Sequence, residues 1–397
     1  MDKKKIIPVV LGGLLLTAIV WSVVTPSNKV SLEVISNPTE FSTNVPDSVA
    51  LKVYVENSGS MDGYMCVGSQ LKDAVFDYIS EAKNMVRTCE LYYINSDVIA
   101  YDGTLDAYIK DLNPLSFARA GGNRANTDLR QIFKAVLDAH KRNTISILVS
   151  DCILDIPEDA RSFFGNCQVS IKNTFNEALV KMPTLGVQVA QLESKFDGTW
   201  FCGNNSERLS GVKRPYYIWV IGDVRLLAKL NREAPLRNVI HGIKNYCAYA
   251  PVKKLPFDAV QKSFVVNHSD VINVSLLVDL STTLQDCDVA GNVGQYHSIH
   301  PEHVKVVSCT PVTEQGSKYS HVVNLEINSP RTLHDERLTF NYPYLAPWVT
   351  TSNDDTGQNI KGNMAKTTGI LYLVTGVAEA YKGYTSCGNF EFILRNK

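Results

Sequence analysis

Short apolar runs of β type alternate with helix-like stretches in the first half of the chain, and this alternation constrains the fold more than any other feature. Runs rich in β-branched or aromatic residues occur at 51–55, 89–94 and 144–150. Between them, apolar residues recur at helical spacing over 70–86 and 128–141. Strands joined by helices form mostly parallel sheets with helices on both faces. We therefore predict an α/β fold with a doubly wound, mostly parallel sheet.

The rest of the chain has a different pattern. The whole chain, with 397 residues, is longer than one ordinary domain, and the composition shifts near 251–256. Alternating apolar runs with turn residues between them follow, at 262–266, 272–280, 303–309, 320–327 and 390–394. This pattern indicates an antiparallel β-sheet domain, with one helix expected over 366–382. We predict a first domain over residues 49–250 and a β-rich C-terminal domain over 251–397.

The N-terminus has the pattern of a membrane anchor. Three lysines at positions 3–5 precede an apolar stretch over 6–24, long enough to cross a bilayer as a helix. No cleavage pattern stands out after it, which favours an uncleaved transmembrane signal-anchor over residues 1–26. Residues 27–48, rich in Ser, Asn, Pro and Thr, are then a tether. The expected location is the inner membrane of a bacterial envelope, single-pass, with the folded part on the periplasmic side.

Polar oxygen donors gather where the predicted strands end. Glu56, Ser58 and Ser60 directly follow the first strand, Asp151 follows the strand at 144–150, and Thr127 lies in a loop that opens a helix. Ligands of open α/β sheets bind at the carboxyl ends of the strands. Because carboxylate and hydroxyl oxygens are hard ligands, the pattern predicts a Mg²⁺ or Mn²⁺ site there.

The run Glu56-Asn57-Ser58-Gly59-Ser60 resembles the Asp-x-Ser-x-Ser motif of the von Willebrand factor A (vWA) domain family, a Rossmann-like fold with a metal-ion-dependent adhesion site. The resemblance spans residues 50–223 and includes Thr127 and Asp151 at the positions of the family's Thr and second Asp. It implies that Ser58 and Ser60 bind Mg²⁺ directly. It also implies that Thr127 binds directly or through water, and that Glu56 and Asp151 act mostly through bound waters. Two departures are Glu56 in place of Asp, and Cys152 where a Gly is common.

The resemblance implies a protein-binding module and not an enzyme, with no catalytic residues assigned. The bound cation keeps one coordination position open, and an Asp or Glu side chain of a protein partner fills it. A formal net charge of −1 argues against a nucleic-acid partner, since phosphate contacts need an excess of Lys and Arg.

Two other functions stay open. One is a metal-assisted hydrolase in which Asp151 or Glu56 acts as the base. The other is a metal-free scaffold whose β-rich domain binds the partner.

Two further patterns carry less weight. His297, His300 and His303 are close in sequence, but Pro301 interrupts any regular helix, which favours a polar loop over a metal site. The nine cysteines are odd in number and show no Cys-x-x-Cys spacing, so no individual disulfide is predicted.

Overall fold

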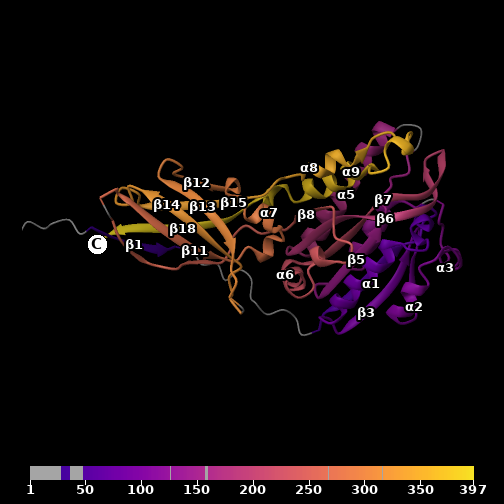
Figure 1. The fold of residues 1–397 in the computed structure, drawn as a ribbon, viewed down its shortest axis with the longest axis horizontal. Helices are drawn as coiled ribbons and strands as arrows, with labels where there is room; N and C mark the ends of the chain where they lie inside the picture. Colours follow the sequence, from indigo (N-terminus) through magenta and orange to yellow (C-terminus); the bar gives the residue numbers. More distant parts are fainter. Residues whose placement is uncertain (1–27, 36–47, 126, 157–159, 267, 315) are drawn as a thin grey trace, which may run out of the picture.

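The chain is described by a computed structural model that covers residues 28–35, 48–125, 127–156, 160–266, 268–314 and 316–397. Two units lie side by side along its long axis (Figure 1). One is an α/β unit on a seven-stranded sheet, and the other is a β unit made of a five-stranded and a four-stranded sheet.

The seven-stranded sheet is mixed. Its strand order is β4-β3-β2-β5-β7-β6-β8. The strands are β2 (Ala50–Glu56), β3 (Thr88–Ile94), β4 (Val98–Tyr101), β5 (Thr144–Ser150), β6 (Leu185–Cys202), β7 (Asn205–Asp223) and β8 (Asn245–Tyr249). β2 pairs in parallel with both β3 and β5, whereas all the other pairings in this sheet are antiparallel.

The prediction of a doubly wound, mostly parallel sheet is therefore wrong. β6 and β7 form one long antiparallel hairpin, paired from Leu185↔Asp223 to Cys202↔Asn205, and β7 lies antiparallel against β5. The apolar run of β5 is buried at every position. Such a run shows that a strand is central, but a central strand is apolar whichever way its neighbours run.

Helices cover both faces of this sheet. On β2, Val53 and Val55 belong to the cluster that includes Leu71 of α1, while Tyr54 belongs to the cluster with Phe133 of α4 and Phe175 of α5. The alternation follows from the two-residue period of a strand. The helices are α1 (Gln70–Lys83), α2 (Leu105–Lys110), α3 (Pro114–Ala120), α4 (Leu129–Asp138), α5 (Ala160–Lys181), α6 (Val224–Glu233), α7 (Cys287–Ala290), α8 (Pro347–Thr351) and α9 (Ile370–Ala380).

The β unit packs two antiparallel sheets, β10-β1-β18-β15-β12 and β13-β14-β11-β9. Phe257 of β9 contacts Phe390 of β18 between the sheets, with ring centroids 5.4 Å apart. The strands are β9 (Phe257–Ala259), β10 (Ser263–Val265), β11 (Val271–Val278), β12 (Tyr296–Ser298), β13 (Val304–Pro311), β14 (His321–Asn328), β15 (Asp335–Asn341) and β18 (Ser386–Asn396). A separate pair is formed by β16 (Asn353–Asp354) and β17 (Thr367–Thr368).

Two segments cross between the units. Strand β1 (Lys29–Val34), inside the segment expected to be a tether, pairs with β10 and β18 of the β unit. Helix α9, from the C-terminal part of the chain, packs on α5 of the α/β unit. Each unit therefore contains a segment that lies far from the rest of that unit in the sequence (Figure 1).

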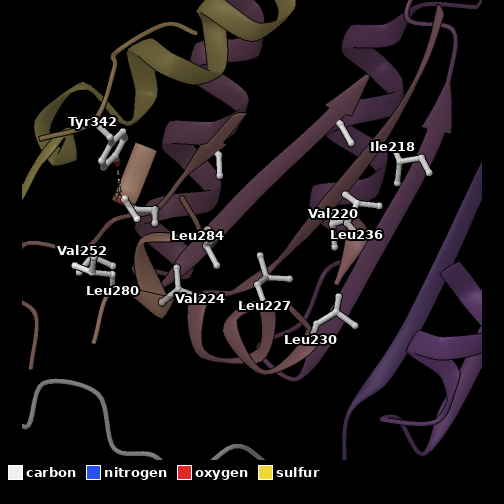
Figure 2. Close-up of a cluster of buried hydrophobic side chains, with 14 of the residues drawn as sticks. Ile218, Val220, Val224, Leu227, Leu230, Leu236, Val252, Leu280, Leu284 and Tyr342 are labelled. Carbon is white, nitrogen blue, oxygen red and sulfur yellow. Dashed lines mark hydrogen bonds between the residues drawn. The ribbon is translucent and has the colours of Figure 1, made fainter. Parts of the chain in front are cut away.

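A shared apolar core joins the units. Figure 2 shows Val224, Leu227 and Leu230 of α6 between strand β7 and the segment that carries Leu280 and Leu284. A Cβ placed on Gly186 of β6 would lie 2.7 Å from Leu284 Cδ1 and 2.9 Å from Val224 Cγ1. Because Gly186 has no side chain, the segment that carries Leu284 can pack directly on the sheet.

The expected transmembrane signal-anchor and inner-membrane location need correction. No helix in the described part of the chain is long enough and apolar enough to cross a membrane. α5 has the length, with 22 residues, but carries Lys172, Glu177 and Lys181, and the apolar α9 has 11 residues. The segment 1–26, on which the expectation rested, lies outside the described residues.

A close backbone approach holds the loop after β2 against the β6–β7 hairpin. A Cβ on Gly198 would lie 2.4 Å from Gly63 Cα, and Gly63 belongs to the 3₁₀ helix η1 (Ser60–Met65). We expect Gly198→Ala to lower the free energy of unfolding by about 2 kcal/mol, because neither backbone can yield. Urea denaturation measures this change.

The matched control is Gly165→Ala in α5, where an added Cβ meets no atom within 4 Å. There we expect stabilisation by about 0.5–1 kcal/mol, because alanine is the better helix former. Equal effects at the two glycines would contradict the close-approach explanation.

Candidate functional site

The five predicted donor residues come together at one end of the sheet. Glu56 is the last residue of β2, Ser58 follows it, and Ser60 begins η1. Asp151 follows β5. Parallel pairing of β2 with β5, in which Val55 lies opposite Val149, brings the two strand ends side by side.

Thr127 reaches the same place from α4. Asp128 caps this helix, its side chain accepting a hydrogen bond from the Arg130 backbone N–H at 2.9 Å. Thr127 precedes the cap and lines the same cavity as Glu56, Ser58 and Ser60. The structure thus brings Thr127 together with three of the other predicted donors.

The carboxylates at the base of the site are buried. Glu56 is 3% exposed and Asp151 1%. The Ser150 hydroxyl donates to Glu56 Oε2, and the Ile153 backbone N–H donates to Asp151 Oδ1 at 3.2 Å. The hydroxyl oxygens of Ser58 and Ser60 lie 3.1 Å apart. These contacts hold hydroxyl and carboxylate oxygens in one small volume.

Two oxygens at this site have no hydrogen-bond partner among the described residues. They are Thr127 Oγ1 and Asp151 Oδ2, and both are buried. An unsatisfied buried polar atom costs about 1–3 kcal/mol, more when it is charged. Native proteins rarely leave such atoms unpaired unless a ligand or water completes them. A bound cation would supply the partner that both oxygens lack.

The pKa values of the two buried carboxyl groups also favour a positive charge nearby. Burial, and then the nearby Asp151 carboxylate, raise the pKa of Glu56 to about 8. Burial also raises the pKa of Asp151, against hydrogen bonds from Ser60 and Ile153 and the charge of Arg214. Two buried carboxylates together disfavour full ionisation, and a nearby cation reverses that preference.

The donor set fits a hard divalent cation. It offers carboxylate oxygens from Glu56 and Asp151 and hydroxyl oxygens from Ser58, Ser60 and Thr127, which are the ligand types of Mg²⁺. In the described ranges, no three His, Cys, Asp or Glu side chains are grouped so as to hold a metal ion. A cation site at this position would therefore need the hydroxyl groups as ligands beside the two carboxylates.

A cavity of about 310 Å³ is lined by four of these donors, Glu56, Ser58, Ser60 and Thr127. Its wall includes residues that sequence reasoning did not select, namely Arg124, Ile153, Asp155 and Phe201. Arg124 Nε donates to the Asn57 carbonyl at 2.7 Å, and Arg124 Nη2 forms an ion pair with Asp62 at 2.5 Å. From the sequence, Arg124 could have been selected as a basic residue shortly after Gly121-Gly122. Phe201 could have been selected because a turn follows Cys202.

Cys152, one of the two departures from the vWA pattern, has a left-handed backbone with φ of 55°. This conformation favours glycine, the residue common at that position in the family. The Cys152 side chain is buried, and its sulfur accepts a hydrogen bond from Trp219 Nε1 at 3.2 Å. Packing against the tryptophan thus offsets the strain of a side chain at this turn.

The histidine group and the cysteines show no such convergence. His300 Nδ1 and His303 Nε2 lie 3.7 Å and 3.9 Å from Glu302 Oε1, on a surface loop without a metal-binding arrangement in the described ranges. All nine cysteines are unpaired thiols.

No family model matches the chain, and no curated protein and no solved structure matches it.

Proposed function

We propose that this protein is a protein-binding module that uses a divalent cation, Mg²⁺ or Mn²⁺, to hold an acidic group of its partner. Glu56, Ser58, Ser60, Thr127 and Asp151 hold the cation in a vWA-like manner. The cation supplies a positive charge with a coordination position open to the partner's Asp or Glu carboxylate. Arg124 adds a second positive charge on the cavity wall.

The observation that carries this proposal is the pair of unsatisfied buried oxygens, Thr127 Oγ1 and Asp151 Oδ2. They lie in different loops, Thr127 before α4 and Asp151 after β5, and at two of the positions that the adhesion motif specifies. The open cavity that Thr127 lines leaves room for a ligand from outside.

Binding is favoured over hydrolysis by the residues around the cavity. Its lining includes no histidine, lysine or cysteine among the described residues, so a serine–histidine or cysteine–histidine pair for acyl transfer is missing from this wall. The apolar side chains of Ile153 and Phe201 instead offer contact area to a ligand.

The test is Mg²⁺ titration of the full chain by calorimetry and thermal shift. We expect saturable binding by the wild type and none by Ser58→Ala/Ser60→Ala, because two direct oxygen ligands are removed. The matched control, Ser206→Ala/Ser210→Ala, removes two exposed hydroxyls on β7 and keeps wild-type binding. Equal Mg²⁺ affinity in wild type and Ser58→Ala/Ser60→Ala would overturn the proposal.

A further inference from the structure

The cavity above the cation donors has an apolar wall on the tip of the β6–β7 hairpin. Phe201 is 45% exposed, although its neighbours Trp200 and Cys202 are buried. A Cβ placed on Gly59 would lie 3.7 Å from Phe201 Cε2. The phenyl ring therefore stands beside the loop that carries Ser58 and Ser60.

The hairpin tip is fastened to the loop after β5. The Gly203 backbone N–H donates to Asp155 Oδ1 at 2.5 Å, and the Cys202 thiol lies 3.6 Å from the Leu154 carbonyl. Asn205 Nδ2 donates to the Gly357 carbonyl at 3.3 Å. These contacts fix the backbone next to Phe201 at the cavity, so the hairpin tip is preorganised for a ligand.

The cavity wall also carries charge. Arg124 uses Nε and Nη2 for its contacts with Asn57, Ser58 and Asp62. Hydrogen bonds within the described residues do not engage its Nη1. This guanidinium group therefore has a donor to offer to an anionic ligand in the cavity.

From this arrangement we infer that the site recognises an acidic side chain directly followed by an aromatic or large aliphatic one. The inference rests on the proposed function and names its ligand class. The carboxylate lies at the cation donors within reach of Arg124, and the adjacent apolar side chain packs on Phe201 and Ile153. A volume of about 310 Å³ is at the lower end of ligand pockets, ~300–1,000 Å³, which suits two side chains and not a long segment.

The probes are three acetylated and amidated tetrapeptides, Gly-Asp-Phe-Gly, Gly-Asp-Ser-Gly and Gly-Asn-Phe-Gly, titrated into the full chain with and without Mg²⁺. We expect the wild type to bind the Asp-Phe peptide about tenfold more tightly than either other peptide, because only it offers both charge and apolar area. In Phe201→Ser we expect the Asp-Phe and Asp-Ser peptides to bind equally, and Phe201→Leu to keep part of the preference.

The control is Val67→Ser, an apolar-to-polar change at a side chain that is 92% exposed and outside the cavity. It keeps the full preference for the Asp-Phe peptide. Equal wild-type affinities for the Asp-Phe and Asp-Ser peptides, a preference that survives in Phe201→Ser, or no binding of any peptide would each overturn the inference.

Cation binding is read separately from peptide preference. A wild type that binds no Mg²⁺ overturns the proposed function, and the peptide comparison without Mg²⁺ then still decides the role of Phe201. A wild type that binds Mg²⁺ but does not distinguish the Asp-Phe from the Asp-Ser peptide retains the proposed function and loses the inference.

Discussion

Replacing Glu56 with Gln should make the metal-free protein more stable above neutral pH while abolishing Mg²⁺ binding. The pKa of Glu56 is raised from 4.5 to about 8 by burial and by Asp151. The folded protein thus binds a proton here more tightly than the unfolded chain does. Protonated Glu56 therefore makes its full contribution to the free energy of unfolding below about pH 4.5, and this contribution is lost as the pH rises to about 8. The side-chain amide in the Glu56→Gln variant does not titrate, so the variant escapes this loss.

The measurement is urea denaturation of wild type and Glu56→Gln between pH 5 and pH 8 with a chelator present. We expect the stability advantage of Glu56→Gln to grow by roughly 1 kcal/mol for each pH unit. Added Mg²⁺ stabilises only the wild type, because ligand binding to the folded state adds to its free energy of unfolding. Glu33→Gln, on the exposed face of β1, should track the wild type. A constant difference between wild type and Glu56→Gln across this pH range would contradict the expectation.

Replacing Arg214 with Met should lower the free energy of unfolding by about 3 kcal/mol. The Arg214 side chain is 1% exposed, and the ion pairs of the described residues do not include it. Its Nη1 donates to the carbonyls of Met364 and Lys366, at 3.0 Å each, and of Asn363 at 3.4 Å. Methionine fills similar space but leaves these carbonyls without a donor, at about 1–3 kcal/mol for each buried group.

Besides the lower stability of the whole protein, we expect Arg214→Met to loosen one segment in particular. Arg214 belongs to β7, and its three acceptors lie just before β17, so it fastens the 363–368 segment to the sheet. Hydrogen exchange by mass spectrometry should show faster exchange over 363–368 in Arg214→Met. The control Arg208→Met removes an exposed ion pair with Asp197, which is worth at most about 1 kcal/mol. A similar decrease in the free energy of unfolding in Arg214→Met and Arg208→Met would show that Arg214 does not hold the 363–368 segment on the sheet.

The helices and central strands were readable from the sequence because each has a strong local period. The pattern over 70–86 corresponds to α1, and the apolar run at 144–150 to β5. The parallel arrangement was wrong because strand direction depends on which strands become neighbours. The hairpin of β6 and β7 places β7 beside β5, and an apolar strand can run either way beside a given neighbour.

The sequence predicted the part of the candidate site whose residues are close together in the chain. It did not predict the part whose residues come together only in the folded protein. Ser58 and Ser60 are two residues apart after a strand, so their proximity is local. Asp151 joins them because β5 pairs with β2. Phe201 and Arg124 lack a sequence motif of this kind, and their place at the cavity comes from the hairpin tip and from contacts with Asn57 and Asp62.

The sequence by itself determined which oxygens lie at the strand ends, since a strand–turn–helix pattern sets the position of a side chain within a few residues. Only the tertiary structure decided that β1 joins the β unit, that α9 packs on α5, and that Phe201 stands beside the loop of the cation donors. The physical reason is range: local periodicity encodes elements, whereas strand direction and cavity walls depend on contacts between residues far apart in the chain, which a local pattern does not record.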